Sequence, residues 1–170
     1  PAEYADIYLA VMGEVNALPD ADEHEILFAP MSPWAWTAAW GDWDDGLAAA
    51  IDRVRAQGGD IDGVAIHAYT REMTVGAVMS DAWFPGRENK WHLHFRGYRD
   101  TTALLAARGL IDLPLYITEA GSVCDPPCDP YRDEDVGYFV AMYEEIFAWN
   151  QAHPHQVIRA VTPYRWTLND

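Results

Sequence analysis

Three side chains stand out for their types and spacing: Glu119, His67 and Tyr69. Glu119 ends the short apolar run 113–118 and is followed by Ala-Gly. A carboxylate at the end of a buried strand is a candidate nucleophile, general acid or general base. The alternative is a structural carboxylate that is solvated or caps the next element.

His67 and Tyr69 lie two residues apart at the end of the run 62–69. Because side chains alternate across a strand, both point to the same side. A tyrosine hydroxyl can hold a neighbouring carboxylate, and a histidine can donate to a sugar hydroxyl or a carboxylate. The alternatives are a core tyrosine with a satisfied hydroxyl and a structural histidine.

The chain is rich in flat aromatic side chains, with eight Trp and nine Tyr. Several lie near predicted strand ends, where a ring can stack on the apolar face of a sugar. The candidates are Trp34, Trp36 and Trp166. For Trp34 and Trp36 the alternative is packing of loop aromatics against the rim of the fold.

The elements that must position these residues alternate between helix and strand. Hydrophobic periodicity predicts helices over 3–16, 44–57, 91–108 and 133–152, and strands over 26–31, 62–69, 113–119 and 157–164. Asp44 or Asp45 is expected to cap the second helix. The long connection 70–89 is typical of a lid or binding loop.

This alternation predicts a single α/β domain, 1–170, with parallel strands whose carboxyl ends carry the candidate residues. Four such strands fit a small open sheet or half of an eight-stranded barrel, which takes about 250 residues. An unrelated open α/β domain would leave Glu119 and Tyr69 far apart.

Three motifs together resemble the clan A glycoside hydrolases, the retaining (β/α)8-barrel enzymes. Ile117-Thr118-Glu119-Ala120-Gly121 resembles their nucleophile motif on strand seven, and His67-Ala68-Tyr69 resembles the His-x-Tyr of strand six. Trp166 matches the strand-eight tryptophan that floors the sugar subsite.

The resemblance implies the second half of a TIM barrel, from helix four to strand eight, and a retaining hydrolase without a cofactor. Glu119 would be the nucleophile, and His67, Tyr69, Trp166, Trp34 and Trp36 would bind the carbohydrate substrate. The acid/base is expected just before residue 1. Inside the chain the second carboxylate would have to come from Glu72, Glu88 or Asp170.

A different class of function is also open: a non-catalytic carbohydrate-binding or scaffolding domain derived from such a barrel. In either case four strands leave two sheet edges uncovered. The sequence therefore predicts a missing barrel half or a second subunit over these edges.

The balance of acidic and basic residues limits the classes of partner that the protein is expected to bind. Acidic residues outnumber basic ones 27 to 11, for a formal net charge of −16. Such a surface repels phosphate backbones and anionic lipid, which disfavours nucleic-acid and membrane partners. No apolar run reaches about 18 residues, the length that a membrane helix needs.

The histidine and cysteine patterns of the sequence give little support for a metal site or for thiol chemistry. The pairs His92/His94 and His153/His155 fall in or beside predicted helices, where residues i and i+2 diverge. Cys124 and Cys128 fit a short disulfide, which would favour an oxidising compartment, or a pair of free thiols. The sequence leaves secreted and cytoplasmic locations open, and predicts no metal.

Overall fold

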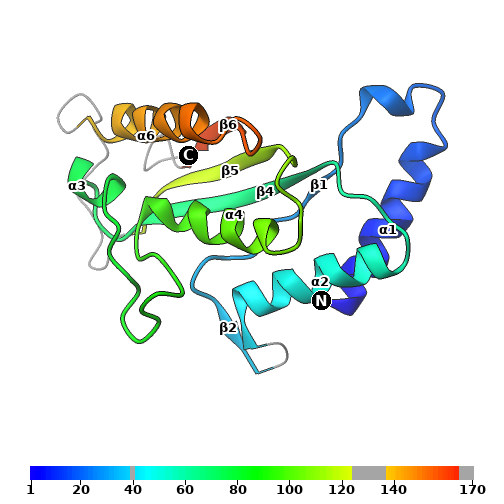
Figure 1. Ribbon diagram of the computed structural model, residues 1–170, viewed down its shortest axis with the longest axis horizontal. Coiled ribbons are helices and arrows are strands. Elements are labelled where there is room, and N and C mark those ends of the chain that lie inside the picture. Colours follow the sequence, from blue (N-terminus) through cyan, green and yellow to red (C-terminus); the bar gives the residue numbers. More distant parts are fainter. Residues whose placement is uncertain (39–40, 124–136, 165–170) are drawn as a thin grey trace.

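The computed structural model describes residues 1–38, 41–123 and 137–164 (Figure 1). Its helices are α1 (Ala2–Asn16), α2 (Trp43–Ala56), α3 (Val75–Val78), α4 (Tyr98–Ala106) and α6 (Tyr138–Ala152), with short 3-10 turns η1 (Ala21–Glu23) and η2 (Phe95–Gly97). Its strands are β1 (Leu27–Phe28), β2 (Trp36–Thr37), β3 (Gly41–Asp42), β4 (Gly63–Thr70), β5 (Leu115–Ser122) and β6 (Ile158–Pro163). No helix in these ranges is long and apolar enough to cross a lipid bilayer.

The centre of the fold is a four-stranded sheet in the order β1-β4-β5-β6, with every neighbouring pair parallel. The order of these four strands in the sheet is the same as their order along the chain. Right-handed crossovers that always step in the same direction put the connecting helices on one face of the sheet. The predicted α/β fold with four parallel strands is confirmed.

The helix-covered face of the sheet forms the hydrophobic core. On β4 the side chains of Val64, Ile66 and Ala68 are buried in it, and on β5 those of Leu115 and Ile117. The alternate residues of β4 face the other way and are partly exposed near the carboxyl end of the strand. This open face carries the candidate site.

A helix packs beside each outer strand of the sheet. On α1, the ring of Tyr4 packs edge-on against Phe28 of β1 with centroids 4.9 Å apart. On α6, the Tyr143 hydroxyl donates to the carbonyl of Val161 on β6 at 3.3 Å. Figure 1 shows α1 and α6 at opposite ends of the molecule, with β4 and β5 between them.

The start of the second helix differs from the prediction. Asp44 and Asp45 lie inside the first turn of α2, and Asp42 occupies the N-cap position without a side-chain capping hydrogen bond. The carboxylate of Asp42 instead accepts hydrogen bonds from Arg87 at 3.1 Å and Lys90 at 2.7 Å. The prediction that Asp44 or Asp45 caps the helix was wrong because α2 begins earlier, at Trp43, and the residue at the N-cap is engaged in tertiary ion pairs.

The third predicted helix begins at Tyr98 rather than near residue 91. Its expected first turn pairs with the preceding loop: Phe84 N–H donates to the carbonyl of Trp91 at 2.7 Å, and Leu93 N–H to that of Ala82 at 2.8 Å. Backbone groups that bond across this loop are unavailable for a helix. The long connection is therefore folded back on itself.

Candidate active site

The position of Glu119 depends on an irregularity in β5. The register pairs Ile66 with Ile117 and then His67 with Glu119, so that Thr118 is an extra residue. Regular pairing would put Glu119 opposite Ala68, on the helix-covered face. The bulge turns the carboxylate onto the open face beside His67, a role that bulges often have next to active sites.

The structure brings together three of the predicted site residues. The Tyr69 hydroxyl donates a hydrogen bond to Glu119 Oε2, and His67 Nδ1 lies 3.5 Å from the same oxygen. This contact between Tyr69 and Glu119 contradicts the unrelated open domain, which required the two residues to be far apart. Both contacts use Oε2, so Oε1 of Glu119 makes no hydrogen bond with the described residues.

Burial sets the protonation of the two groups that hold Glu119. Burial and the hydrogen bond to Glu119 raise the pKa of the Tyr69 hydroxyl well above its usual range, so it remains a donor. Burial lowers the pKa of His67 below 6.5, and the Glu119 carboxylate opposes that shift. His67 is therefore neutral at pH 7. The Glu119 side chain is 36% exposed and open to a ligand.

Tyr164 is a site residue that sequence reasoning missed. Its ring meets that of Tyr69 edge-to-face with centroids 6.4 Å apart, and its backbone N–H donates to the carbonyl of Ala120 at 2.7 Å. Tyr164 is 51% exposed and so presents an aromatic face beside the carboxylate. Its place at the carboxyl end of the predicted strand 157–164 was the available signal.

The predicted aromatic residues have different surroundings. Trp34 is partly buried: its Nε1–H donates to the carbonyl of His92 at 2.9 Å, and its ring stacks against Phe84 with centroids 6.2 Å apart. Trp36, on the small β2–β3 ribbon, is 62% exposed. Trp166 lies outside the described residues. The sugar-binding role of all three stays a prediction.

Two of the three candidates for the second carboxylate make no contact with Glu119. Glu88 accepts the backbone N–H of Gly86 at 2.9 Å in its own exposed loop. Glu72 interacts electrostatically with His94. The third, Asp170, lies outside the described residues.

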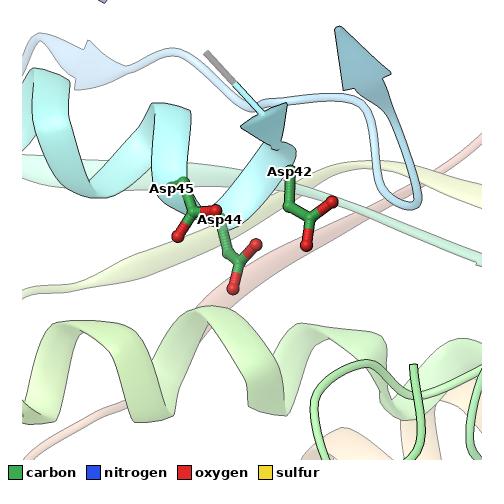
Figure 2. A group of neighbouring side chains, drawn as sticks. All are labelled: Asp42, Asp44 and Asp45. Atoms are coloured by element: carbon green, nitrogen blue, oxygen red, sulfur yellow. The ribbon is translucent and has the colours of Figure 1, made fainter. Parts of the chain in front are cut away.

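Among the described residues, Asp42, Asp44 and Asp45 form one group of close carboxylates at the start of α2 (Figure 2). The ammonium of Lys90 lies 2.7, 3.3 and 3.7 Å from oxygens of these three residues, in that order. Two protein cations, Lys90 and Arg87, thus already contact the cluster. These ion pairs join the loop after α3 to α2.

The His-x-His pairs do not converge on a common point. His92 Nδ1 contacts Asp100 at 2.6 Å, whereas His94 Nδ1 accepts the backbone N–H of Arg71 at 3.3 Å. His153 stacks on Trp149, and His155 lies 3.3 Å from Asp112. Cys124 and Cys128 lie outside the described residues, so the disulfide stays a prediction.

Comparison with known proteins gives a likeness of fold. No protein-family model matches the chain, and no curated protein matches its sequence. Among solved structures it is similar to a beta-porphyranase of glycoside hydrolase family 86 from the human gut bacterium Bacteroides plebeius, with a TM-score of 0.53 and 18% identity. The match covers 95% of this chain and 26% of that one, so this chain spans about a quarter of the enzyme's length. The chain thus shares the α/β fold of part of a glycoside hydrolase.

Proposed function

We propose that this chain is the carboxyl-terminal half of the (β/α)8 barrel of a retaining glycoside hydrolase, with Glu119 as its nucleophile. The observation that carries this proposal is the hydrogen bond from the Tyr69 hydroxyl to Glu119 Oε2, while Oε1 makes no hydrogen bond to the described residues. The acid/base comes from chain that precedes residue 1 in the barrel.

The geometry suits the chemistry of retention. An ionised carboxylate attacks the anomeric carbon while a second carboxyl group, about 5 to 5.5 Å away, protonates the leaving oxygen. Water then hydrolyses the glycosyl-enzyme. A donor on one oxygen keeps the carboxylate ionised and oriented, and leaves the other oxygen to attack.

A bridge of side chains crosses the sheet from one edge to the other. Arg159 Nη1 on β6 lies 2.8 Å from Glu25 Oε1, just before β1, and 3.0 Å from the hydroxyl of Tyr116 on β5. In a flat sheet the outer strands of four lie about 14 Å apart, because each spacing is about 4.8 Å. Extended Arg and Glu side chains can span this distance, so the bridge is compatible with the half-barrel but does not depend on it.

A second function is favoured by one observation. Within the described ranges, the side chain of Glu119 contacts the Tyr69 hydroxyl and the His67 ring, and it makes no hydrogen bond to another carboxyl group. A domain that kept the sugar cleft without an acid/base would bind carbohydrate without cleaving it. This is the non-catalytic binding or scaffolding alternative.

Covalent trapping separates the two functions. A 2-fluoro glycoside with a dinitrophenol leaving group needs no acid, because the leaving group departs unprotonated, and the fluorine slows breakdown of the glycosyl-enzyme. We expect a panel of gluco, galacto, xylo and manno reagents to yield one adduct on the peptide that contains Glu119. Peptide mass spectrometry locates it.

The variants make this test specific. Glu119→Gln is expected to remain unlabelled, whereas Glu88→Gln, which alters an exposed loop carboxylate, is labelled as the parent protein is. Oligosaccharide binding without any adduct on Glu119 would reject the nucleophile assignment and favour the binding domain.

A further inference from the structure

Arg71 differs from most arginines of this acidic chain. The guanidinium groups of the following residues each lie within 4 Å of a carboxylate: Arg53, Arg87, Arg96, Arg99, Arg108 and Arg159. Within the described ranges, Arg71 makes no such ion pair. With 27 acidic and 11 basic residues, a guanidinium without a carboxylate needs an explanation.

Aromatic rings hold Arg71 in place instead. Its guanidinium carbon lies 4.5 Å from the ring centroid of Trp34 and 5.8 Å from that of Phe84. The two rings stack at an interplanar angle of 26°. The backbone N–H of Arg71 donates to His94 Nδ1 at 3.3 Å, which fixes the start of the side chain.

We propose that Arg71, on the platform of Trp34 and Phe84, binds an anionic substituent on the carbohydrate. The shared chemistry is an oxyanion that offers two oxygens side by side to a guanidinium, either the carboxylate of a uronic acid or the sulfate ester of a sugar. Stacking occupies the flat face of the guanidinium and leaves the N–H donors at its edge for a bidentate contact. This inference rests on the proposed function for the presence of a sugar chain.

The location matches a neighbouring subsite. Arg71 directly follows β4, two residues beyond Tyr69, and Trp34 follows β1. Because β4 lies between β1 and β5, the guanidinium is at the same end of the sheet as Glu119 but on the β1 side. It therefore meets a sugar unit next to the one that Glu119 attacks.

The net charge of the protein limits how densely charged a bound carbohydrate chain can be. A formal net charge of −16 repels a densely charged polyanion, and the attraction at Arg71 acts on one group at one position. We expect preference for a chain with isolated anionic units over both an uncharged chain and a fully substituted one.

The test compares matched oligosaccharides. Glucan, galactan, xylan and mannan hexasaccharides are each used unmodified, sparsely O-sulfated or sparsely O-carboxymethylated, and binding is measured by titration calorimetry at constant ionic strength. For the backbone that binds, Arg71→Ala should weaken binding of the anionic form about 10- to 100-fold, the usual range for a charged hydrogen bond. The neutral form should change less than about twofold. The tighter of the two anionic forms identifies the oxyanion.

The control is Arg55→Ala, because Arg55 also has no carboxylate partner in the described ranges and donates to the carbonyl of Arg108, at 2.8 Å. It should leave every affinity unchanged. Arg71→Gln retains a polar side chain with N–H donors but has no charge, so it removes the charge more mildly if Arg71→Ala disturbs the loop. Equal loss of neutral and anionic binding in both Arg71 variants would overturn the proposal and leave Arg71 a structural residue.

The inference and the proposed function fail separately. Anion selectivity that depends on Arg71, without covalent trapping at Glu119, would retain the subsite and reject the nucleophile. Trapping at Glu119, together with equal affinity for neutral and anionic chains, would retain the nucleophile and reject the anion-binding subsite at Arg71.

Discussion

Glu119 lies opposite His67 in the parallel pairing of β4 and β5, whereas an unbroken register would place it opposite Ala68. The extra residue, Thr118, moves the carboxylate from the helix-covered face to the open face of the sheet. There it meets the Tyr69 hydroxyl and the His67 ring. A single bulge thus converts a core-facing position into an accessible one.

The Tyr69 hydroxyl should control the reactivity of Glu119. Tyr69→Phe removes the donor on Oε2, so the carboxylate loses both orientation and a hydrogen bond to its ionised form. We expect covalent trapping of Glu119 to slow about 100-fold, the usual effect of losing one well-placed donor in an active site. The rate of adduct formation, followed by intact mass, measures this.

Tyr116→Phe is the matched control for this experiment. Tyr116 also donates from β5 to a carboxylate, Glu25 at 2.5 Å, but outside the contacts of Glu119. Its loss should leave the trapping rate unchanged. Equal slowing in both variants would mean that the effect passes through general destabilisation rather than through Glu119.

Stability should fall as the pH drops through the titration of His67. The pKa of folded His67 is lowered from 6.5 by burial, with Glu119 opposing. Just below pH 6.5 the unfolded chain therefore binds more protons than the folded one, so acidification favours unfolding. Above that pH both states are neutral at this residue, and the effect disappears.

Urea unfolding of the parent protein and His67→Gln between pH 5 and 8 measures this difference. The stability lost between pH 7 and pH 5 should be smaller in the variant, because the variant lacks the group. Parallel curves for the two proteins would show that His67 is not held in its neutral form.

Strand alternation and topology predicted much of the site, but not its details. His67 and Tyr69 share a face because they are two residues apart, and parallel strands bring them to the same end as Glu119. The bulge at Thr118 was not predictable, since alternation alone assigns Glu119 to the opposite face. Arg71 was also missed, because its position on the rings of Trp34 and Phe84, without an ion pair to a described carboxylate, depends on residues far apart in the chain.

Other parts of the fold depend on side-chain contacts that hydrophobic periodicity does not encode. The helix expected from residue 91 begins at Tyr98, because Asp100 accepts hydrogen bonds from His92 N–H at 2.7 Å and from its ring and so fixes the preceding turn. Local periodicity contains no information on such contacts. The same reason explains why no pattern indicated that Glu145 is buried.

Removing Glu145 should strongly destabilise the domain. This side chain is 4% exposed and contacts Arg96 at 2.9 Å, Arg99 at 2.5 Å and the Tyr98 hydroxyl at 2.8 Å. Burial alone raises the pKa of Glu145, but these hydrogen bonds outweigh it and lower the pKa. Glu145→Ala removes the buried partner of two guanidinium groups, which keep only their contacts with the exposed Asp81. The expected cost is about 1 to 3 kcal/mol in the free energy of unfolding.

Glu144→Ala is the control, because the adjacent carboxylate is exposed on α6. It should change the free energy of unfolding by no more than about 0.5 kcal/mol. Urea denaturation measures both variants. A small effect of Glu145→Ala would mean that water replaces the carboxylate and that the cluster does not join α4 to α6.

The outer face of α6 should make the chain associate when it is studied alone. Val140, Tyr143 and Phe147 are 56%, 51% and 67% exposed and line an open groove of about 620 Å³ next to the edge strand β6. Apolar surface of this kind normally lies against another element. In the half-barrel, the next strand and helix of the barrel cover it.

Sedimentation velocity over a range of concentrations tests this expectation. The parent chain should show concentration-dependent association, and Phe147→Lys should reduce it, because a charge in the groove opposes burial. Ile111→Lys changes a residue of the loop between α4 and β5 that is 46% exposed, and should have no such effect. A monodisperse monomer would count against the half-barrel, because a closed domain has no need of a partner over β6 and α6.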